Sequence, residues 1–304
     1  MRGNIMNMKE INARVLSNGM TRLEWWTSLN IGQDPVPCEV NARKVLNVPF
    51  GTDSDRQCYD VYMPVEPGVY PTIFRVHGGG WFTGHRADKN MIRYAKLAEH
   101  GYVVVSIGYR LANEAVFPGP VEDVWNGIQA VLAKADEYGI DKDRIGITAG
   151  SAGTSISALL AVQHPELIKV AILEASILDF KGMRHHYERL ERERKRYYYP
   201  DEDTAIESLY LGGSVLEIPE VVEKATPANF ITENAPYFML CHGLEDVTTP
   251  YLQSVEFART LCQVTGDDNR AEVVLLPNTA HAYNHQWNDP KLFDWKLDFL
   301  KRHL

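Results

Sequence analysis

Three side chains of the sequence could form a nucleophilic site together with a bare stretch of backbone. Ser151 is flanked only by glycine and alanine, and an acid at Asp246 and a histidine at His281 follow it later in the chain. Upstream, residues 78–80 are three consecutive glycines. In acyl transfer a serine attacks a carbonyl, a histidine takes its proton, a carboxylate orients the imidazole, and backbone N–H groups hold the oxyanion. These residue types fit that chemistry, provided that the fold brings them together.

The serine lies on a turn that must be sharp. Residues 144–148 predict a short buried strand, and residues 155–163 predict a helix rich in good helix formers. Only the stretch AGSAG and Thr154 separate the two, so the backbones of strand and helix must nearly touch. The usual pattern for such a serine is G-x-S-x-G, from which Ala149 departs. The alternative is a glycine-rich turn around a phosphate, although no Gly-Lys-Ser/Thr follows and G-x-G-x-x-G is incomplete.

The glycine run follows a predicted strand and needs a physical reason, because consecutive glycines weaken a fold by entropy. Close approach of the backbone N–H groups of Gly79 and Gly80 to an oxyanion is such a reason. The alternative is a flexible turn at the end of the strand.

Each of the acid and the histidine has rivals in the sequence. Asp246 follows a predicted strand and could orient an imidazole, but it could also cap the next helix. Glu245 beside it is the competing acid, and Asp179 is a more distant one. His281 lies in the loop that leaves the last predicted strand, and His285 is its main rival.

The elements that must position these groups alternate between strand and helix from residue 71 onward, which predicts a parallel sheet covered on both faces. In that part of the chain the predicted strands are 72–77, 102–107, 144–148, 169–175, 237–241 and 271–276, and the predicted helices are 89–100, 121–138, 155–163, 253–263 and 290–302. Residues 40–48 and 58–63 predict an antiparallel pair at the sheet edge. Each candidate group then follows the carboxyl end of a strand, where open α/β sheets bind ligands.

The composition predicts one globular α/β domain over residues 1–304, with an N-terminal segment at 1–38 and an insertion at 180–225. The net charge of −9 argues against nucleic acid or an anionic membrane as the main partner. Four widely spaced cysteines without C-x-x-C suit neither a metal site nor a disulfide framework. No apolar run is long enough for a signal peptide or a membrane span, so we expect a cytoplasmic protein.

The chain resembles the α/β-hydrolase superfamily from about Asp60 to the C-terminus. The likeness is to its esterase/lipase branch with an H-G-G-G-W motif, which includes hormone-sensitive-lipase-like and bacterial feruloyl/acetyl-esterase-like enzymes. It includes the text VVVSIGYRL at 103–111 and DRIGI at 143–147, and the order Ser…Asp…His is that of the superfamily. In the lipase-like group an Asp often stands where this chain has Gly150.

The resemblance implies an α/β-hydrolase fold with a mostly parallel twisted sheet of about eight strands and a small lid at 180–225. It implies Ser151 as nucleophile, Asp246 as acid, His281 as base, and the N–H groups of Gly79, Gly80 and Ala152 as the oxyanion hole. Trp81 is a candidate pocket residue. So are Tyr197, Tyr198 and Tyr199, for which a packing role is an equal alternative.

The implied function is that of a serine carboxylesterase that needs no metal or organic cofactor. Its substrates would be small carboxylic esters with short acyl chains, with acetylated or feruloylated carbohydrate among the candidates. The alternatives are an aminopeptidase or oligopeptidase on the same fold, and a non-catalytic homologue that binds ligands. The oligomeric state stays open, with a homo-oligomer as one possibility.

Overall fold

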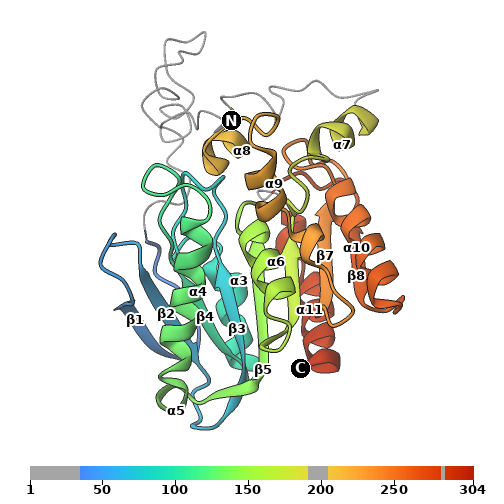
Figure 1. Ribbon diagram of the computed structural model, residues 1–304. Helices are drawn as coiled ribbons and strands as arrows, with labels where there is room; N and C mark the ends of the chain where they lie inside the picture. The colour runs from blue at the N-terminus through green and yellow to red at the C-terminus, as the bar shows by residue number, and fades with distance from the viewer. Residues whose placement is uncertain (1–34, 191–204, 282–284) are drawn as a thin grey trace.

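The computed structural model describes residues 35–190, 205–281 and 285–304, and these form an eight-stranded sheet with helices on both faces (Figure 1). The strand order across the sheet is β1-β2-β4-β3-β5-β6-β7-β8. In chain order the strands are β1 (Arg43–Pro49), β2 (Cys58–Met63), β3 (Tyr70–Val76), β4 (Val103–Ile107), β5 (Ile140–Gly150), β6 (Ile168–Glu174), β7 (Tyr237–Gly243) and β8 (Ala271–Leu276).

Strands β3 to β8 pair in parallel, whereas β1 and β2 run antiparallel at one edge. The central strands are largely apolar and mostly buried, as expected for strands that are covered on both faces. In β4, for example, all five residues are buried. The predicted antiparallel pair at the edge and the predicted parallel sheet are both confirmed.

The sheet separates the apolar core into two layers, and helices cover it on each face. The layer on one face includes buried residues of α4, α6 and α10, and the other includes those of α3, η1 and α11. The bounds are α3 (Met91–Ala95), η1 (Lys96–His100), α4 (Gly119–Leu132), α5 (Ala135–Tyr138), α6 (Gly153–Gln163), α7 (Met183–Leu190), α8 (Ile206–Leu211), α9 (Pro219–Ala225), η2 (Pro227–Phe230), α10 (Leu252–Thr265), η3 (His285–Asn288) and α11 (Pro290–His303).

Two predicted helices are interrupted in the structure. The helix expected over 121–138 is divided into α4 and α5, because Lys134 leaves the helical region with φ −111° and ψ 24°. The helix expected over 89–100 begins as α3 and continues as the 3₁₀ turn η1. Both segments end where predicted, since Gly101 and Gly139 adopt the left-handed conformation that ends a helix.

The predicted insertion falls between β6 and β7. Its described parts contain α7, α8 and α9, of which α8 and α9 lie above the carboxyl ends of the strands in Figure 1. Movement of this segment as a lid stays a prediction. Among the described helices, none is both long and apolar enough to cross a bilayer.

Candidate active site

The turn that carries Ser151 is as sharp as the sequence requires. Strand β5 ends at Gly150 and helix α6 begins at Gly153. Ser151 has a φ of 53°, a left-handed conformation that is strained for a residue with a side chain. A Cβ atom at Gly153 would lie 2.6 Å from the His77 carbonyl oxygen, so this flank admits only glycine. The methyl group of Ala149 on the other flank is buried in the core, which explains why alanine is tolerated there.

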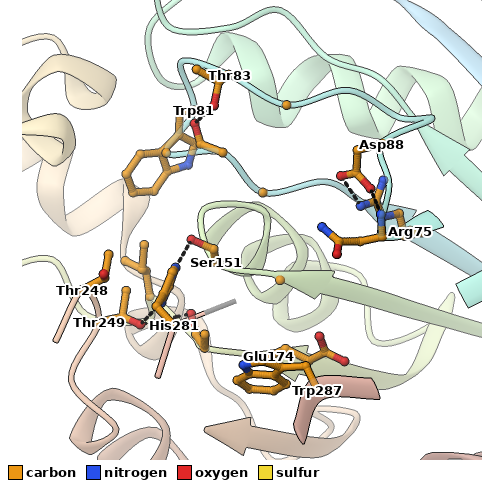
Figure 2. A pocket seen from close by; sticks show the side chains of 18 of the residues that line it. Arg75, Trp81, Thr83, Asp88, Ser151, Glu174, Thr248, Thr249, His281 and Trp287 are labelled. Carbon is orange, nitrogen blue, oxygen red and sulfur yellow. Dashed lines mark hydrogen bonds and ion pairs between the residues drawn. The ribbon is translucent and has the colours of Figure 1, made fainter. Parts of the chain in front are cut away.

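Ser151, His281 and Asp246 lie in one hydrogen-bonded line, of which Figure 2 shows the part between Ser151 and His281. Ser151 Oγ is 2.8 Å from His281 Nε2, and His281 Nδ1 is 2.7 Å from Asp246 Oδ2. An ionised carboxylate only accepts, so Nδ1 carries the imidazole proton and donates it to Asp246. Nε2 is then left as the acceptor for the Ser151 hydroxyl. This tautomer can take the serine proton when the oxygen attacks.

The carboxylate of Asp246 is buried but fully supplied with donors. The backbone N–H groups of Thr248 and Thr249 each donate to its Oδ1 at 2.8 Å, and the Thr249 hydroxyl donates to Oδ2 at 3.0 Å. Burial alone would raise the pKa of Asp246, but the imidazoles of His281 and His242 outweigh it and hold this pKa far below its usual range. Asp246 is therefore ionised and fixed in direction.

The rival acids point elsewhere. Glu245 is exposed at the surface, whereas Asp246 beside it is 3% exposed and reaches His281. Asp179 Oδ1 accepts the N–H of Gly182 ahead of α7. The side chain of His285 lies outside what the structure describes. The structure thus brings Asp246 to His281, as the sequence-based assignment requires.

The glycine run forms a tight loop whose conformation excludes larger residues. Gly79 and Gly80 have φ values of 115° and 59°. A Cβ at Gly79 would lie 2.2 Å from the Thr83 carbonyl oxygen, and one at Gly78 would lie 3.2 Å from Ser151 Cβ. The loop is therefore pressed against the serine turn, and only glycine fits this approach.

Backbone donors at this junction have no protein acceptor. Within the described parts of the chain, the N–H groups of Gly79, Gly80 and Ala152 make no hydrogen bond. Ala152 directly follows Ser151 in the chain, and Gly79 and Gly80 line the same cavity as the serine and His281. Unsatisfied N–H groups at such a site are available to an incoming oxygen atom.

A cavity of about 200 Å³ opens over Ser151 and His281. Trp81 lines it and is itself fully buried, because its ring stacks on Tyr210 at a centroid distance of 4.4 Å. Ile206 of α8 also lines the cavity, so the insertion contributes to the wall. Tyr197, Tyr198 and Tyr199 fall outside the described residues, so their role in the pocket stays a prediction.

His77, which directly precedes the glycine run, supports the glycine loop from inside the protein core. His77 is 1% exposed, its ring stacks on Tyr109 at 4.2 Å, and its Nδ1–H donates to the Gly78 carbonyl oxygen at 2.8 Å. Burial, together with the nearby charge of Arg75, lowers the pKa of His77 to about 3. The buried imidazole is thus neutral, and protonating it would require taking a charge out of water.

We expect His77 to make the folded state sensitive to acid. An unfolded chain binds a proton at this histidine below about pH 6.5, while the folded chain does so only near pH 3. Since the unfolded state binds more protons between these values, the free energy of unfolding falls as pH falls, by about 1.4 kcal/mol per pH unit from this group.

In His77→Asn, whose amide can keep the hydrogen bond to Gly78, the decline in the free energy of unfolding should be shallower in urea titrations at pH 6.5 to 5. The exposed His100→Asn should keep the wild-type slope, and equal slopes for all three proteins would contradict the prediction.

Sequence reasoning missed several residues that hold the site together. Thr249 supports Asp246 from three positions away, and His242, which is fully buried, lies 3.5 Å from the same carboxylate. The spacing D-x-T-T was a local signal for a turn around Asp246. Glu174 is the last residue of β6 and lies at the same edge of the sheet as the other candidate groups. Its position at the carboxyl end of a predicted strand was a signal that could have identified it.

Comparison with known proteins points to esterases. A sequence model of the BD-FAE family matches residues 59–261. Esterase LipC of Mycobacterium tuberculosis is 30% identical over 259 residues, covering 81% of this chain and 60% of LipC. A probable isoprenylcysteine alpha-carbonyl methylesterase, ICMEL1 of Arabidopsis thaliana, is 28% identical over 249 residues, covering 76% and 49%. The chain thus spans about half to three fifths of the length of these relatives.

Solved structures share the fold at lower identity. A truncated carbohydrate esterase from gut microbiota superposes with a TM-score of 0.74 at 22% identity, covering 88% of this chain and 98% of that one. An inhibited esterase B from Lactobacillus rhamnosis superposes with a TM-score of 0.68 at 21% identity, covering 92% and 90%. These likenesses show the α/β-hydrolase fold that the sequence predicted.

Proposed function

Because this chain belongs to the BD-FAE family, we propose that it is a serine carboxylesterase that hydrolyses small carboxylic esters through an acyl-enzyme on Ser151. The observation that carries the proposal is the line from Ser151 Oγ to His281 Nε2 at 2.8 Å and from His281 Nδ1 to Asp246 at 2.7 Å. Relatives named as esterases or carboxylesterases support the same reaction class.

In the proposed first half-reaction, His281 accepts the Ser151 proton as the serine oxygen attacks the ester carbonyl. The tetrahedral oxyanion would receive hydrogen bonds from Gly79, Gly80 and Ala152, whose N–H groups make none within the described chain. His281 then gives the proton to the leaving alkoxide, and the alcohol departs. Asp246 stays ionised and stabilises the imidazolium through Nδ1–H.

In the second half-reaction, water attacks the acyl carbon and gives a proton to His281. The Ser151–acyl bond breaks as His281 returns that proton to the serine oxygen, and the carboxylic acid is released. The partner of the site is therefore a small ester. A cavity of about 200 Å³ supports short acyl groups, with acetylated or feruloylated carbohydrate as candidate substrates. A cytoplasmic location and a homo-oligomeric state stay predictions.

An active-site probe combined with a substrate panel tests the proposal. A fluorophosphonate should label the wild-type chain once, and peptide mapping should place the label on Ser151. The panel contains p-nitrophenyl esters of increasing acyl length, acetylated sugars, feruloyl esters and peptide p-nitroanilides. We expect the p-nitrophenyl acetate or propionate to give the highest kcat/KM among the acyl lengths. Absence of labelling would favour the ligand-binding alternative, and faster cleavage of peptide anilides than of esters would favour the peptidase alternative.

A further inference from the structure

A buried carboxylate lies behind the serine turn, surrounded by donors from two helices. Glu174, the last residue of β6, is 3% exposed. Its Oε2 is 3.2 Å from Arg93 Nη2 and accepts a 3.2 Å hydrogen bond from the Tyr94 hydroxyl, while Lys296 of α11 contacts Oε1. Burial alone would raise the pKa of Glu174, but Arg93 and Lys296 outweigh it and keep this pKa below its ordinary value. The carboxylate of Glu174 is therefore ionised and held in place by Arg93, Tyr94 and Lys296.

The backbone of Glu174 holds the turn that carries the nucleophile. Its carbonyl oxygen accepts the N–H of Ser151 at 2.8 Å. A Cβ atom placed on Gly150 would lie 3.7 Å from the Tyr94 hydroxyl and 4.0 Å from Glu174 Oε2. The charged cluster therefore reaches the backbone immediately before the serine.

The same cluster also reaches the loop that carries the histidine. Arg93 Nη1 donates to the Trp287 carbonyl oxygen at 3.1 Å, and Trp287 Nε1 donates to the Ala280 carbonyl oxygen at 3.1 Å. That carbonyl belongs to the peptide bond directly before His281. Figure 2 shows Glu174 and Trp287 beside each other, on the side of Ser151 away from Trp81.

We propose that Arg93 is a positioning residue, which joins the Ser151 turn to the His281 loop by bridging Glu174 and Trp287. This inference rests on the proposed esterase function. Attack requires the serine and imidazole to stay aligned, and a displacement of about 1 Å can cost about a hundredfold in rate. Arg93 lines the same cavity as Ser151, but within the described chain it forms no hydrogen bond or ion pair with Ser151 or His281, so it would act on the rate through the loops that it connects.

The chemistry of arginine explains why this position needs it. Two nitrogens of one planar guanidinium serve two acceptors in different directions, the Glu174 carboxylate and the Trp287 carbonyl. A lysine in its place could keep the ion pair with Glu174 but would lose the fixed second bond. Buried ion pairs contribute little net stability on average, so a structural role alone gives a weak reason for this arrangement.

The test compares Arg93→Lys with a matched variant that touches the same carboxylate. Lys296→Met removes the other cation on Glu174 but leaves the bridge to Trp287 in place. With p-nitrophenyl acetate we expect Arg93→Lys to lower kcat by about a hundredfold with KM within twofold. Lys296→Met should keep kcat within about threefold. Trp287→Phe, which keeps a ring but loses the donor to Ala280, should reproduce the loss, and the double variant should lose little more because one connection is already broken.

Three results would overturn the inference. One is wild-type kcat in Arg93→Lys. Another is an equal loss of kcat in Lys296→Met, which would indicate a general effect of charge. The third is a rise in KM confined to an ester with an anionic acyl group, such as p-nitrophenyl hemisuccinate, which would make Arg93 a substrate contact. Urea midpoints measured for each variant exclude misfolding as the cause. Failure of the esterase proposal looks different, since the wild-type chain would then neither turn over esters nor react with fluorophosphonate.

Discussion

Replacing Ser151 by alanine is expected to lower kcat for p-nitrophenyl acetate on the order of 10⁶-fold, as loss of a serine nucleophile does in other hydrolases. The hydroxyl oxygen forms the acyl bond, and no other hydroxyl is hydrogen-bonded to His281 Nε2 in the described chain. The fold should persist, because the left-handed φ of 53° at this position is as strained for serine as for alanine. Steady-state rates and a urea unfolding curve for the same preparation measure both parts.

Ser157, on the helix α6 that follows the serine turn, provides the matched control. Its hydroxyl is buried and makes no hydrogen bond within the described chain, so Ser157→Ala removes an unsatisfied group and should leave kcat and stability nearly unchanged. Fluorophosphonate should label Ser157→Ala and fail to label Ser151→Ala. A Ser151→Ala variant that kept the wild-type rate would remove the basis of the proposed function.

The fold could be predicted because its signals are local and repeated. Apolar strands alternating with helices indicate a parallel sheet, and the structure has one. The exact helix bounds were less accessible, since the interruption at Lys134 depends on a backbone conformation that no motif marks. Residues 180–225 interrupt the alternation in the sequence, and in the structure this segment falls between β6 and β7.

The two flanks of the serine turn differ in how tightly they are packed, and the sequence pattern does not distinguish them. The sequence argument required small residues on both flanks of Ser151, which made Ala149 a departure from the usual pattern. In the structure only the helical flank is crowded, because Gly153 packs on the carbonyl oxygens of Val76 and His77 at the end of β3. The strand flank points into the core, where a methyl group is an ordinary occupant. The pattern alone contains no information on which flank is tight.

The supporting contacts could not be predicted in the same way. Arg93, Glu174 and Trp287 lie far apart in the sequence and meet because α3, β6 and η3 converge at one end of the sheet. None belongs to a motif, and each has an ordinary surface or core interpretation from the sequence alone. Only the packing of one core layer, which includes residues of α3 and Trp287, brings them to the backbone of Ser151 and the loop of His281.

Replacing Asp246 by asparagine is expected to lower kcat on the order of 10⁴-fold while the site keeps its shape. The N–H groups of Thr248 and Thr249 both donate to Oδ1, so the asparagine carbonyl oxygen should occupy that position and direct its NH₂ group toward His281. An NH₂ donor facing Nδ1 forces the imidazole proton onto Nε2. The nitrogen that faces Ser151 would then carry a proton and could not accept another.

Glu245→Gln is the matched control for this substitution, because it neutralises the neighbouring rival acid without touching the line of hydrogen bonds. Its kcat for p-nitrophenyl acetate should stay within about twofold of the wild-type value. Asp246→Asn should also react slowly with fluorophosphonate, since the serine is no longer activated, whereas Glu245→Gln should react at the wild-type rate. If the two variants exchanged these behaviours, Glu245 would be the acid. The buried carboxylate at 246, with its pKa held low by two imidazoles, would then have only a structural role.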